Sequence, residues 1–233
     1  MGFFQRLFEN VFREESSAPA GSFEDLNTEE LEAHLAVARY GDFVMTGAVR
    51  PAFNLQVIPR EGYRHEVYFD EQSRKDVPVL MASASRERLF DLFLEMLDPL
   101  GDELDVVLET SHNRPGQGHV DLYREHIDLS VLKSMLCDYE DLLLNDGCTG
   151  IAVLNPNLPL ELQFDEHKLL IVYGNDLTPF EEILKRADLS CDERLKFVTE
   201  AEHIHSSSEF FAEQFEELKL RLGMDGHDDA AFC

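Results

Sequence analysis

The chain has 233 residues, of which 47 are acidic and 20 are basic, so its formal net charge is −27. A surface this negative repels the phosphate backbone of nucleic acids and anionic lipid headgroups, so we expect no nucleic-acid partner. Either a basic partner or a saline habitat would account for this acidity.

The rest of the composition is that of a globular protein. Hydrophobic residues make up 44% of the chain, an ordinary share for a protein that buries a core. No run approaches the roughly 18 apolar residues of a membrane span. The four cysteines are far apart, and this spacing favours free thiols in a reducing compartment over a disulfide framework or a zinc knuckle. We therefore expect a cytoplasmic protein that carries no cofactor.

Residues 1–22 are predicted to form an amphipathic helix followed by a flexible linker. Apolar side chains recur at helical spacing over residues 3–15, and a segment rich in Ser, Ala and Pro follows. Such a face must be buried. Three ways are open: packing on the chain's own core, packing on a sister subunit, or lying on a membrane surface, for which the helix offers little positive charge. The apolar positions are Phe3, Phe4, Leu7, Phe8, Val11 and Phe12.

A pattern that occurs twice organises the rest of the chain. Residues 66–71 and 161–166 both read Glu, apolar, any residue, Phe, Asp, Glu, and similar apolar runs and helix-like segments flank the two copies. Such self-similarity indicates a repeated structural unit. We therefore predict an α+β fold of two pseudo-symmetric αβββα units with a mainly antiparallel sheet, a bridging hairpin and C-terminal helices. The first repeat covers residues 23–111 and the second covers 112–190.

Periodicity and breaker residues place the individual elements. A capping sequence from Asn27 begins a helix that ends near Tyr40. The other elements of the first repeat are strands at 42–49, 53–58, 64–70 and 77–82 and a helix at 86–97. The bridging hairpin comprises 104–110 and 120–126. The second repeat comprises a helix at 129–144, strands at 149–154, 159–164 and 168–173, and a helix at 178–187. Residues 191–223 are predicted to hold helices at 191–201 and 207–222, before an acidic tail at 224–233.

The stretch after the first copy resembles a bacterial signature. Residues 77–83 read Val-Pro-Val-Leu-Met-Ala-Ser and precede a helix-like segment from Arg86 to Phe90. This order is similar to the apolar-Pro-Val-Phe-Thr-Ser stretch and following helix of SseB-type (enhanced serine sensitivity) domains. Met81 and Ala82 replace the Phe-Thr of that family, and the second copy lacks the proline. The resemblance implies a small bacterial α+β interaction domain, present as a divergent tandem repeat, with no catalytic residues to carry over.

The pair His203 and His205 is the candidate metal site of the sequence. Two histidines at this spacing on a strand point to one side and take Zn²⁺ when a third ligand joins them. Cys191, Glu200 and Glu202 are nearby in sequence, but none has a spacing typical of a zinc site. We interpret the stretch as a solvated turn before a helix, with metal binding as the alternative.

The glycine-rich loop 111–119 contains His112, Arg114 and His119, and Asp121 and His126 follow on the next strand. His119 and Asp121 face one side at strand period, so with a distant carboxylate they could serve general acid–base chemistry. The other interpretations are a solvated hairpin tip and a loop that contacts a ligand or a partner.

The two Asp–Glu pairs, 70–71 and 165–166, also admit two interpretations. Paired carboxylates in two copies could bind a divalent cation through oxygen. However, each pair follows a strand at a predicted hairpin turn, where turn chemistry favours Asp. We therefore interpret both pairs as structural.

The sequence contains no G-x-S-x-G elbow, and its glycines match neither a P-loop nor a dinucleotide fingerprint. It therefore favours a non-catalytic module for protein–protein interaction or regulation, which contacts a protein partner or self-associates, for example as a homodimer. One alternative is a metal-binding protein or a hydrolase-like enzyme that uses a His/Asp cluster. Another is a peripheral membrane adaptor that uses the N-terminal helix. The expected partner-contact residues are Phe4, Phe8, Phe12, His112, Arg114 and His119.

Overall fold

The computed structural model describes residues 21–23, 26–70, 74–112 and 120–224. The predicted N-terminal helix at 3–15, the tip of the 111–119 loop and the acidic tail from residue 225 lie outside these ranges. Nothing in the structure therefore tests those three predictions.

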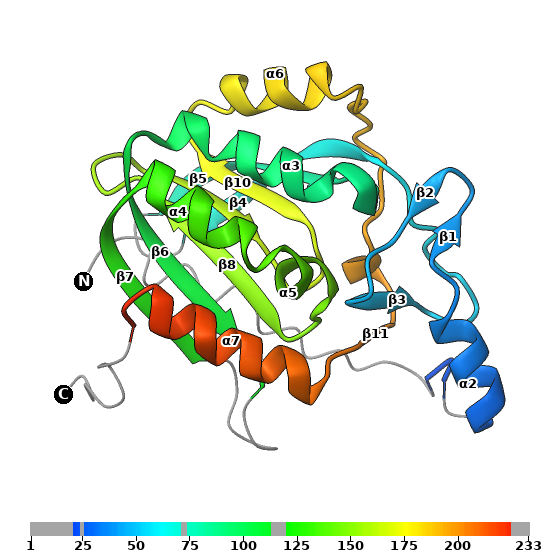
Figure 1. Cartoon of the computed structure of the whole chain (residues 1–233). Helices are drawn as coiled ribbons and strands as arrows, with labels where there is room; N and C mark the ends of the chain where they lie inside the picture. The colour runs from blue at the N-terminus through cyan, green and yellow to red at the C-terminus, as the bar shows by residue number, and fades with distance from the viewer. Residues whose placement is uncertain (1–20, 24–25, 71–73, 113–119, 225–233) are drawn as a thin grey trace.

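A seven-stranded antiparallel sheet forms the centre of the fold (Figure 1). Its strand order is β4-β5-β10-β9-β8-β6-β7, and every neighbouring pair is antiparallel. The predicted α+β class with a mainly antiparallel sheet is thus confirmed. The strands are β4 (Gly62–Asp70), β5 (Lys75–Ser83), β6 (Glu103–Thr110), β7 (Val120–Asp128), β8 (Thr149–Leu154), β9 (Leu160–Phe164) and β10 (Leu170–Gly174).

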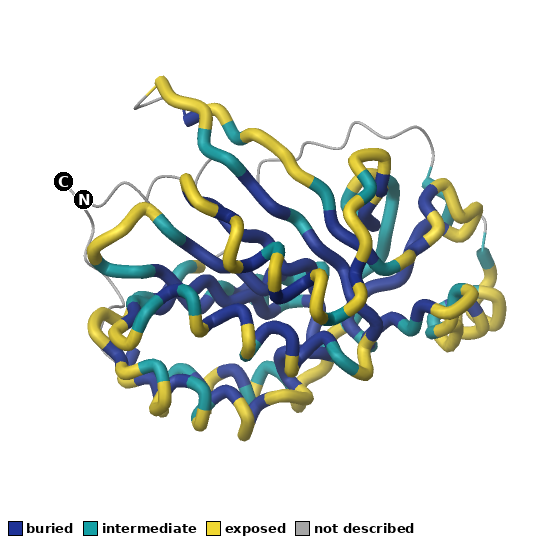
Figure 2. The backbone as a smooth tube through the Cα atoms, turned by 90° about the horizontal axis from the view of Figure 1, so that it is seen from above, coloured by how far each residue is buried: buried dark blue, intermediate teal, exposed yellow. Residues whose placement is uncertain are grey.

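One face of the sheet packs against helices, and the main hydrophobic core lies between the two layers (Figures 1 and 2). Phe180, Ile183 and Leu184 of α6 are buried because they recur at helical spacing on one side. The rings of Phe93 and Phe164 meet in this core with their centroids 5.0 Å apart. The helices of this layer are α3 (Arg86–Met96), α4 (Leu129–Cys137), α5 (Glu140–Asn145), α6 (Thr178–Arg186) and α7 (Glu209–Arg221), with a 3₁₀ turn at Asp98–Leu100. Among the described residues, no helix has the length and apolarity that crossing a membrane requires.

A smaller group of elements packs at one end of the sheet. Asn27 caps its helix as predicted, because its side chain accepts from the amide of Glu30 over 3.0 Å while its own amide donates to the Glu30 carboxylate. Strand β11 pairs antiparallel with β3, which places His203 opposite Pro51. The elements of the group are α2 (Thr28–Leu35), β1 (Arg39–Tyr40), β2 (Phe43–Val44), β3 (Val49–Pro51), a 3₁₀ turn at Val198–Glu200 and β11 (His203–His205).

Residues 53–58 do not form the predicted strand. The amide of Leu55 donates to the carbonyl of Ala52 over 2.9 Å, and Leu55 has a φ of 49°. Strand residues need a negative φ, so the left-handed backbone conformation of Leu55 interrupts any strand through this position. The chain therefore turns here after β3 ends at Pro51.

Two predicted helices also differ from the structure. The helix predicted at 129–144 is two helices, because Tyr139 has φ −120° and ψ 22°, outside the helical region. The helix predicted at 191–201 is absent. Leu195 and Phe197 are instead buried together against β5 and β10, and an extended chain brings residues two apart to the same side. The C-terminal region thus holds one helix, α7, preceded by strand β11.

The two copies of the repeated pattern contribute to one continuous sheet. β5, which follows the first copy, pairs with β10, which follows the second, and the helices after them, α3 and α6, are in contact. The copies differ in environment, since Phe69 is exposed and Phe164 is buried. The pseudo-symmetry of two αβββα units stays a prediction.

Candidate metal centre

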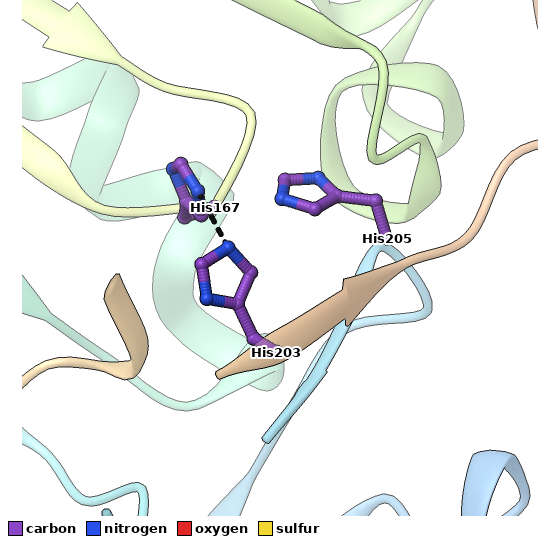
Figure 3. Close-up of side chains that lie close together, drawn as sticks. All are labelled: His167, His203 and His205. Atoms are coloured by element: carbon purple, nitrogen blue, oxygen red, sulfur yellow. Dashed lines mark hydrogen bonds between the residues drawn. The ribbon is translucent and has the colours of Figure 1, made fainter. Parts of the chain in front are cut away.

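Three histidines from two separate segments meet at the end of the sheet beside β3. His167 lies in the turn between β9 and β10, and His203 and His205 lie on β11 (Figure 3). The Nε2 atoms of His167 and His203 are 3.1 Å apart. One ring nitrogen from each histidine lies within 4.8 Å of the other two. The structure thus adds His167, which the sequence interpretation missed, to the predicted pair.

The backbone explains why β11 presents both of its histidines to this point. His203 and His205 are two residues apart on a strand that pairs with β3, so their side chains point to the same side. The pairing continues past the strand, where the amide of Ser206 donates to the carbonyl of Ala48 over 2.7 Å. The stretch is therefore a strand, and the interpretation as a solvated turn was wrong.

A tight turn presents His167 from the other side. The amide of Lys168 donates to the carbonyl of Asp165 over 3.0 Å, and Lys168 has a φ of 65°. The Asp165 carboxylate closes the turn by accepting from the amide of Leu169 over 2.7 Å. Asp165 therefore has the structural turn role expected from the sequence, and the same turn carries a histidine into the centre.

Hydrogen bonds fix the orientation of all three imidazole rings. Nδ1 of His203 lies 2.8 Å from the carbonyl oxygen of Ala201, and Nδ1 of His205 lies 2.7 Å from that of Gly147. A carbonyl oxygen can only accept, so each Nδ1 carries a hydrogen and each neutral ring has its lone pair on Nε2. Nδ1 of His167 lies 2.9 Å from the carboxylate Oδ2 of Asp165, which orients that ring in the same way. The three Nε2 atoms therefore face one another, as Figure 3 shows.

The charge state of the centre follows from its surroundings. Burial lowers the pKa of His205 to about 4, and the nearby His167 makes a smaller contribution in the same direction. This ring is therefore neutral at pH 7. Burial disfavours the charged form of His167 as well, but the carboxylates of Asp165 and Glu166 outweigh it and raise its pKa. Without a metal ion, the proton on Nε2 of charged His167 forms a hydrogen bond to Nε2 of His203 over 3.1 Å. A divalent cation at the same point would replace that proton.

A second polar group is connected to the centre through residues 146–149. Buried Asp146 accepts from His112 over 2.7 Å and from Thr149 over 2.5 Å. Burial alone would raise the pKa of Asp146, but the hydrogen bonds from His112, Ser207 and Thr149 lower it. The amine of Lys168 donates to the carbonyl of Thr149 over 2.7 Å. Gly147 directly follows Asp146, and its carbonyl oxygen bonds to Nδ1 of His205. The hydrogen bonds of Asp146 therefore fix the backbone that orients His205.

His167 and Lys168 also line a cavity of about 30 Å³ beside the centre. A volume of this size holds about two water molecules, since one water needs roughly 10–15 Å³. Burial lowers the pKa of the Lys168 amine to about 8, so a small change in its surroundings would discharge it. The other residues of the cavity wall include Phe43, Met45, Pro59, Leu89, Phe197 and Val198.

The group of His65, Cys191 and Glu193 is less suited to a metal ion. Both ring nitrogens of His65 are engaged by carboxylates, Nδ1 by Glu193 over 2.9 Å and Nε2 by Glu181 over 3.0 Å. These contacts raise the pKa of His65, with the hydrogen bond to Glu193 as the largest cause. The ring therefore favours its charged form. Burial and then Glu193 raise the pKa of the Cys191 thiol to about 11, and a thiol must lose its proton to bind a metal.

The other groups considered from the sequence lie elsewhere. His126 is paired with Glu103 over 3.1 Å on an exposed strand end, and Glu200 is paired with Arg64 over 2.7 Å. His112 faces Asp146 and the ring of Phe215 rather than solvent. The remaining partner-contact candidates, Phe4, Phe8, Phe12, Arg114 and His119, lie outside the described residues.

Comparison with known protein families, curated proteins and solved structures finds no match to this chain or its fold. The resemblance to SseB-type domains therefore stays a prediction.

Proposed function

We propose that the protein binds a divalent transition metal ion, with Zn²⁺ as the best fit, through Nε2 of His167, His203 and His205. One observation carries this proposal: the Nε2 atoms of the three rings face one point, and a hydrogen-bond acceptor holds each Nδ1. Metal-binding histidines show this arrangement, because the second hydrogen bond fixes the tautomer and aims the ring. Two nitrogens bound to one tetrahedral Zn²⁺ are about 3.3 Å apart, close to the 3.1 Å between His167 and His203.

Three histidines without a cysteine are typical of zinc sites that keep one position open. Closed structural sites use four protein ligands and are usually rich in cysteine, whereas three-histidine sites hold a water or a substrate as the fourth ligand. An ion bound here would supply Lewis-acid chemistry and lower the pKa of that water towards 7. Asp165 would raise the basicity of His167 through its hydrogen bond. The protein's own contribution is a half-buried cluster of donors whose orientation is fixed.

The direct test is zinc titration of the full chain by calorimetry, after treatment with a chelator. We expect one ion per chain. His167→Ala or His203→Ala should weaken binding by at least about 100-fold, and Asp165→Asn by about 10- to 100-fold, the range for loss of an outer-shell partner. The matched control is His126→Ala, because this histidine is exposed and paired with Glu103. It should leave the affinity unchanged.

Proton release gives a second readout of the same site. Because His167 has a raised pKa, the ion must displace its proton, and the affinity should fall as the pH drops through that pKa. Titrations in buffers of different ionisation enthalpy count the protons released. Stoichiometric zinc that survives in both alanine variants, or no zinc bound by the unaltered chain, would refute the proposal. The three rings would then form only a proton-sharing network.

A second candidate function is self-association, which one observation favours. β4 is an edge strand, and its Val67 and Phe69 are 65% and 53% exposed. Residues 190–193 bond to this edge at Tyr63 and His65, and Val67 and Phe69 lie farther along it. An edge with exposed apolar side chains pairs readily with another strand, and two copies of an antiparallel edge are self-complementary. If this occurs, Val67→Lys should convert a dimer into a monomer in light scattering. Val131→Lys on α4, also at an exposed valine, is the control.

A further inference from the structure

The sheet face opposite the helices contains a buried apolar patch with no described cover. Val107, Ala152 and Leu154 are buried there together, with Tyr123 packed against them. Ala152 and Val107 are only 0% and 3% exposed, although all four residues belong to the sheet itself. The segment with Leu195 and Phe197 lies over the neighbouring part of this face, on side chains of β4, β5 and β10.

Polar side chains in the middle of this face are buried as well. The strand register places Leu154 opposite Glu161 and Ala152 opposite Gln163, so these side chains share one face. Gln163 donates to Oε1 of Glu161 over 2.7 Å. Oε2 of Glu161 and Oε1 of Gln163 are buried and have no partner among the described residues. Because a bare sheet face would be hydrated, a further segment must exclude water from this one.

The amino-acid composition of the remaining segments indicates which of them can cover this sheet face. Residues 24–25 and 71–73 are too short, and residues 113–119 contain no large apolar side chain. Residues 225–233 carry three aspartates and a single phenylalanine, which suits a solvated tail. Residues 1–20 are the remaining choice, and they supply the face of Phe3, Phe4, Leu7, Phe8, Val11 and Phe12.

The N-terminal segment is anchored at Ser22, beside the group of elements at one end of the sheet. The amide of Ser22 donates to the Glu202 carboxylate over 2.6 Å, and its hydroxyl accepts from the amide of Phe53 over 3.0 Å. From this anchor, residues 16–21 span up to about 20 Å when extended. A helix over residues 3–15 is about 20 Å long, and four neighbouring strands cover about 15 Å. One helix is thus long enough to cross β6, β8, β9 and β10.

We propose that residues 3–15 dock as an amphipathic helix on this face, with their phenylalanines over Val107, Ala152 and Leu154. The chain's own N-terminal segment, and not a membrane or a second copy, then buries the apolar face of that helix. The sheet becomes a middle layer with helices on both sides. This proposal does not depend on metal binding.

Two full-length reporter variants measure burial of the segment. The chain contains no tryptophan, so Phe8→Trp gives a single emission signal. We expect blue-shifted emission that acrylamide quenches weakly. Glu9→Trp, on the opposite side of the same helix, is the control and should emit like a solvated indole. Solvent-like emission from both variants would overturn the proposal.

Photo-crosslinking then locates the contact. The photoreactive residue p-benzoylphenylalanine replaces Phe8, or Glu9 as the control, in an equal mixture of ¹⁵N-labelled and unlabelled chains. Crosslinks from position 8 to residues 104–109, 151–154 or 161–163 within one chain would support the proposal. Crosslinks that join labelled to unlabelled chains would overturn it in favour of a second copy. Crosslinks that fall only on other surfaces, or equally from position 9, would also overturn it.

Discussion

Glu161 makes the stability of the protein depend on pH in a way that can be worked out from the structure. Its side chain is fully buried in the middle of the sheet, and burial raises its pKa from 4.5 to about 8. Between these two values the folded protein keeps a proton that the unfolded chain has lost. Stability therefore falls as the pH rises through this window.

The perturbation that removes this effect is Glu161→Gln, which keeps the shape and cannot ionise. Each pH unit within the window costs the unaltered protein about 1.4 kcal/mol. The variant should gain about 3 kcal/mol relative to the unaltered protein between pH 5.5 and pH 7.5. Glu109, whose pKa is raised to about 9 by burial first and then by the charges of Asp121 and Glu161, is present in both proteins. Its effect cancels below about pH 8, where Glu161 is protonated in the folded protein and adds no charge.

Urea unfolding at several pH values measures this difference. The free energy of unfolding of the variant minus that of the unaltered protein should rise with pH and become constant above about pH 8. Glu125→Gln, at an exposed position on β7, is the control and should show a small difference at every pH. A difference for Glu161→Gln that does not change with pH would refute the assignment of a buried, neutral carboxyl.

Two further predictions concern the candidate metal centre and the core. In Gly147→Ala, the new Cβ would lie 2.4 Å from the carbonyl oxygen of Ala48, so we expect a loss of about 1–3 kcal/mol in stability from the forced shift. Zinc affinity in calorimetry should fall as well, because Gly147 holds His205; an unchanged affinity would contradict the role given to this carbonyl. Phe93→Ala should cost about 3–5 kcal/mol in urea unfolding, because the side chain is fully buried against Phe164. The control Phe69→Ala, at an exposed position, should stay within about 0.5 kcal/mol, and similar losses for both would contradict the assigned core.

Elements with local signals could be predicted from the sequence. The strands of the β8–β9–β10 meander and helix α6 lie within two residues of their expected bounds, because alternating or helically spaced apolar residues and nearby turn residues mark them. Residues 191–201 were mispredicted because Leu195 and Phe197 are fixed by packing against β5 and β10. No local signal reports such a contact.

The candidate metal centre could likewise be predicted only in part. The pair His203 and His205 could be found from its spacing, but His167 lies 36 residues away from His203. Only the pairing of β11 with β3 and the turn after β9 bring these residues together. The available signal was the Asp165-x-His167 spacing in a predicted turn, which by itself is common in turns without any metal.

The pairing of β3 with β11 also bears on the order in which the protein folds. It joins residues 49–51 to residues 203–205, so roughly 150 residues of chain must be arranged before it can form. The hairpins β8–β9 and β9–β10 need only local closure, and they should form early. The three histidines therefore come together only when β3 and β11 have paired beside the seven-stranded sheet. A partly synthesised or partly folded chain could present one or two of these ligands, but the complete set exists only in the native protein.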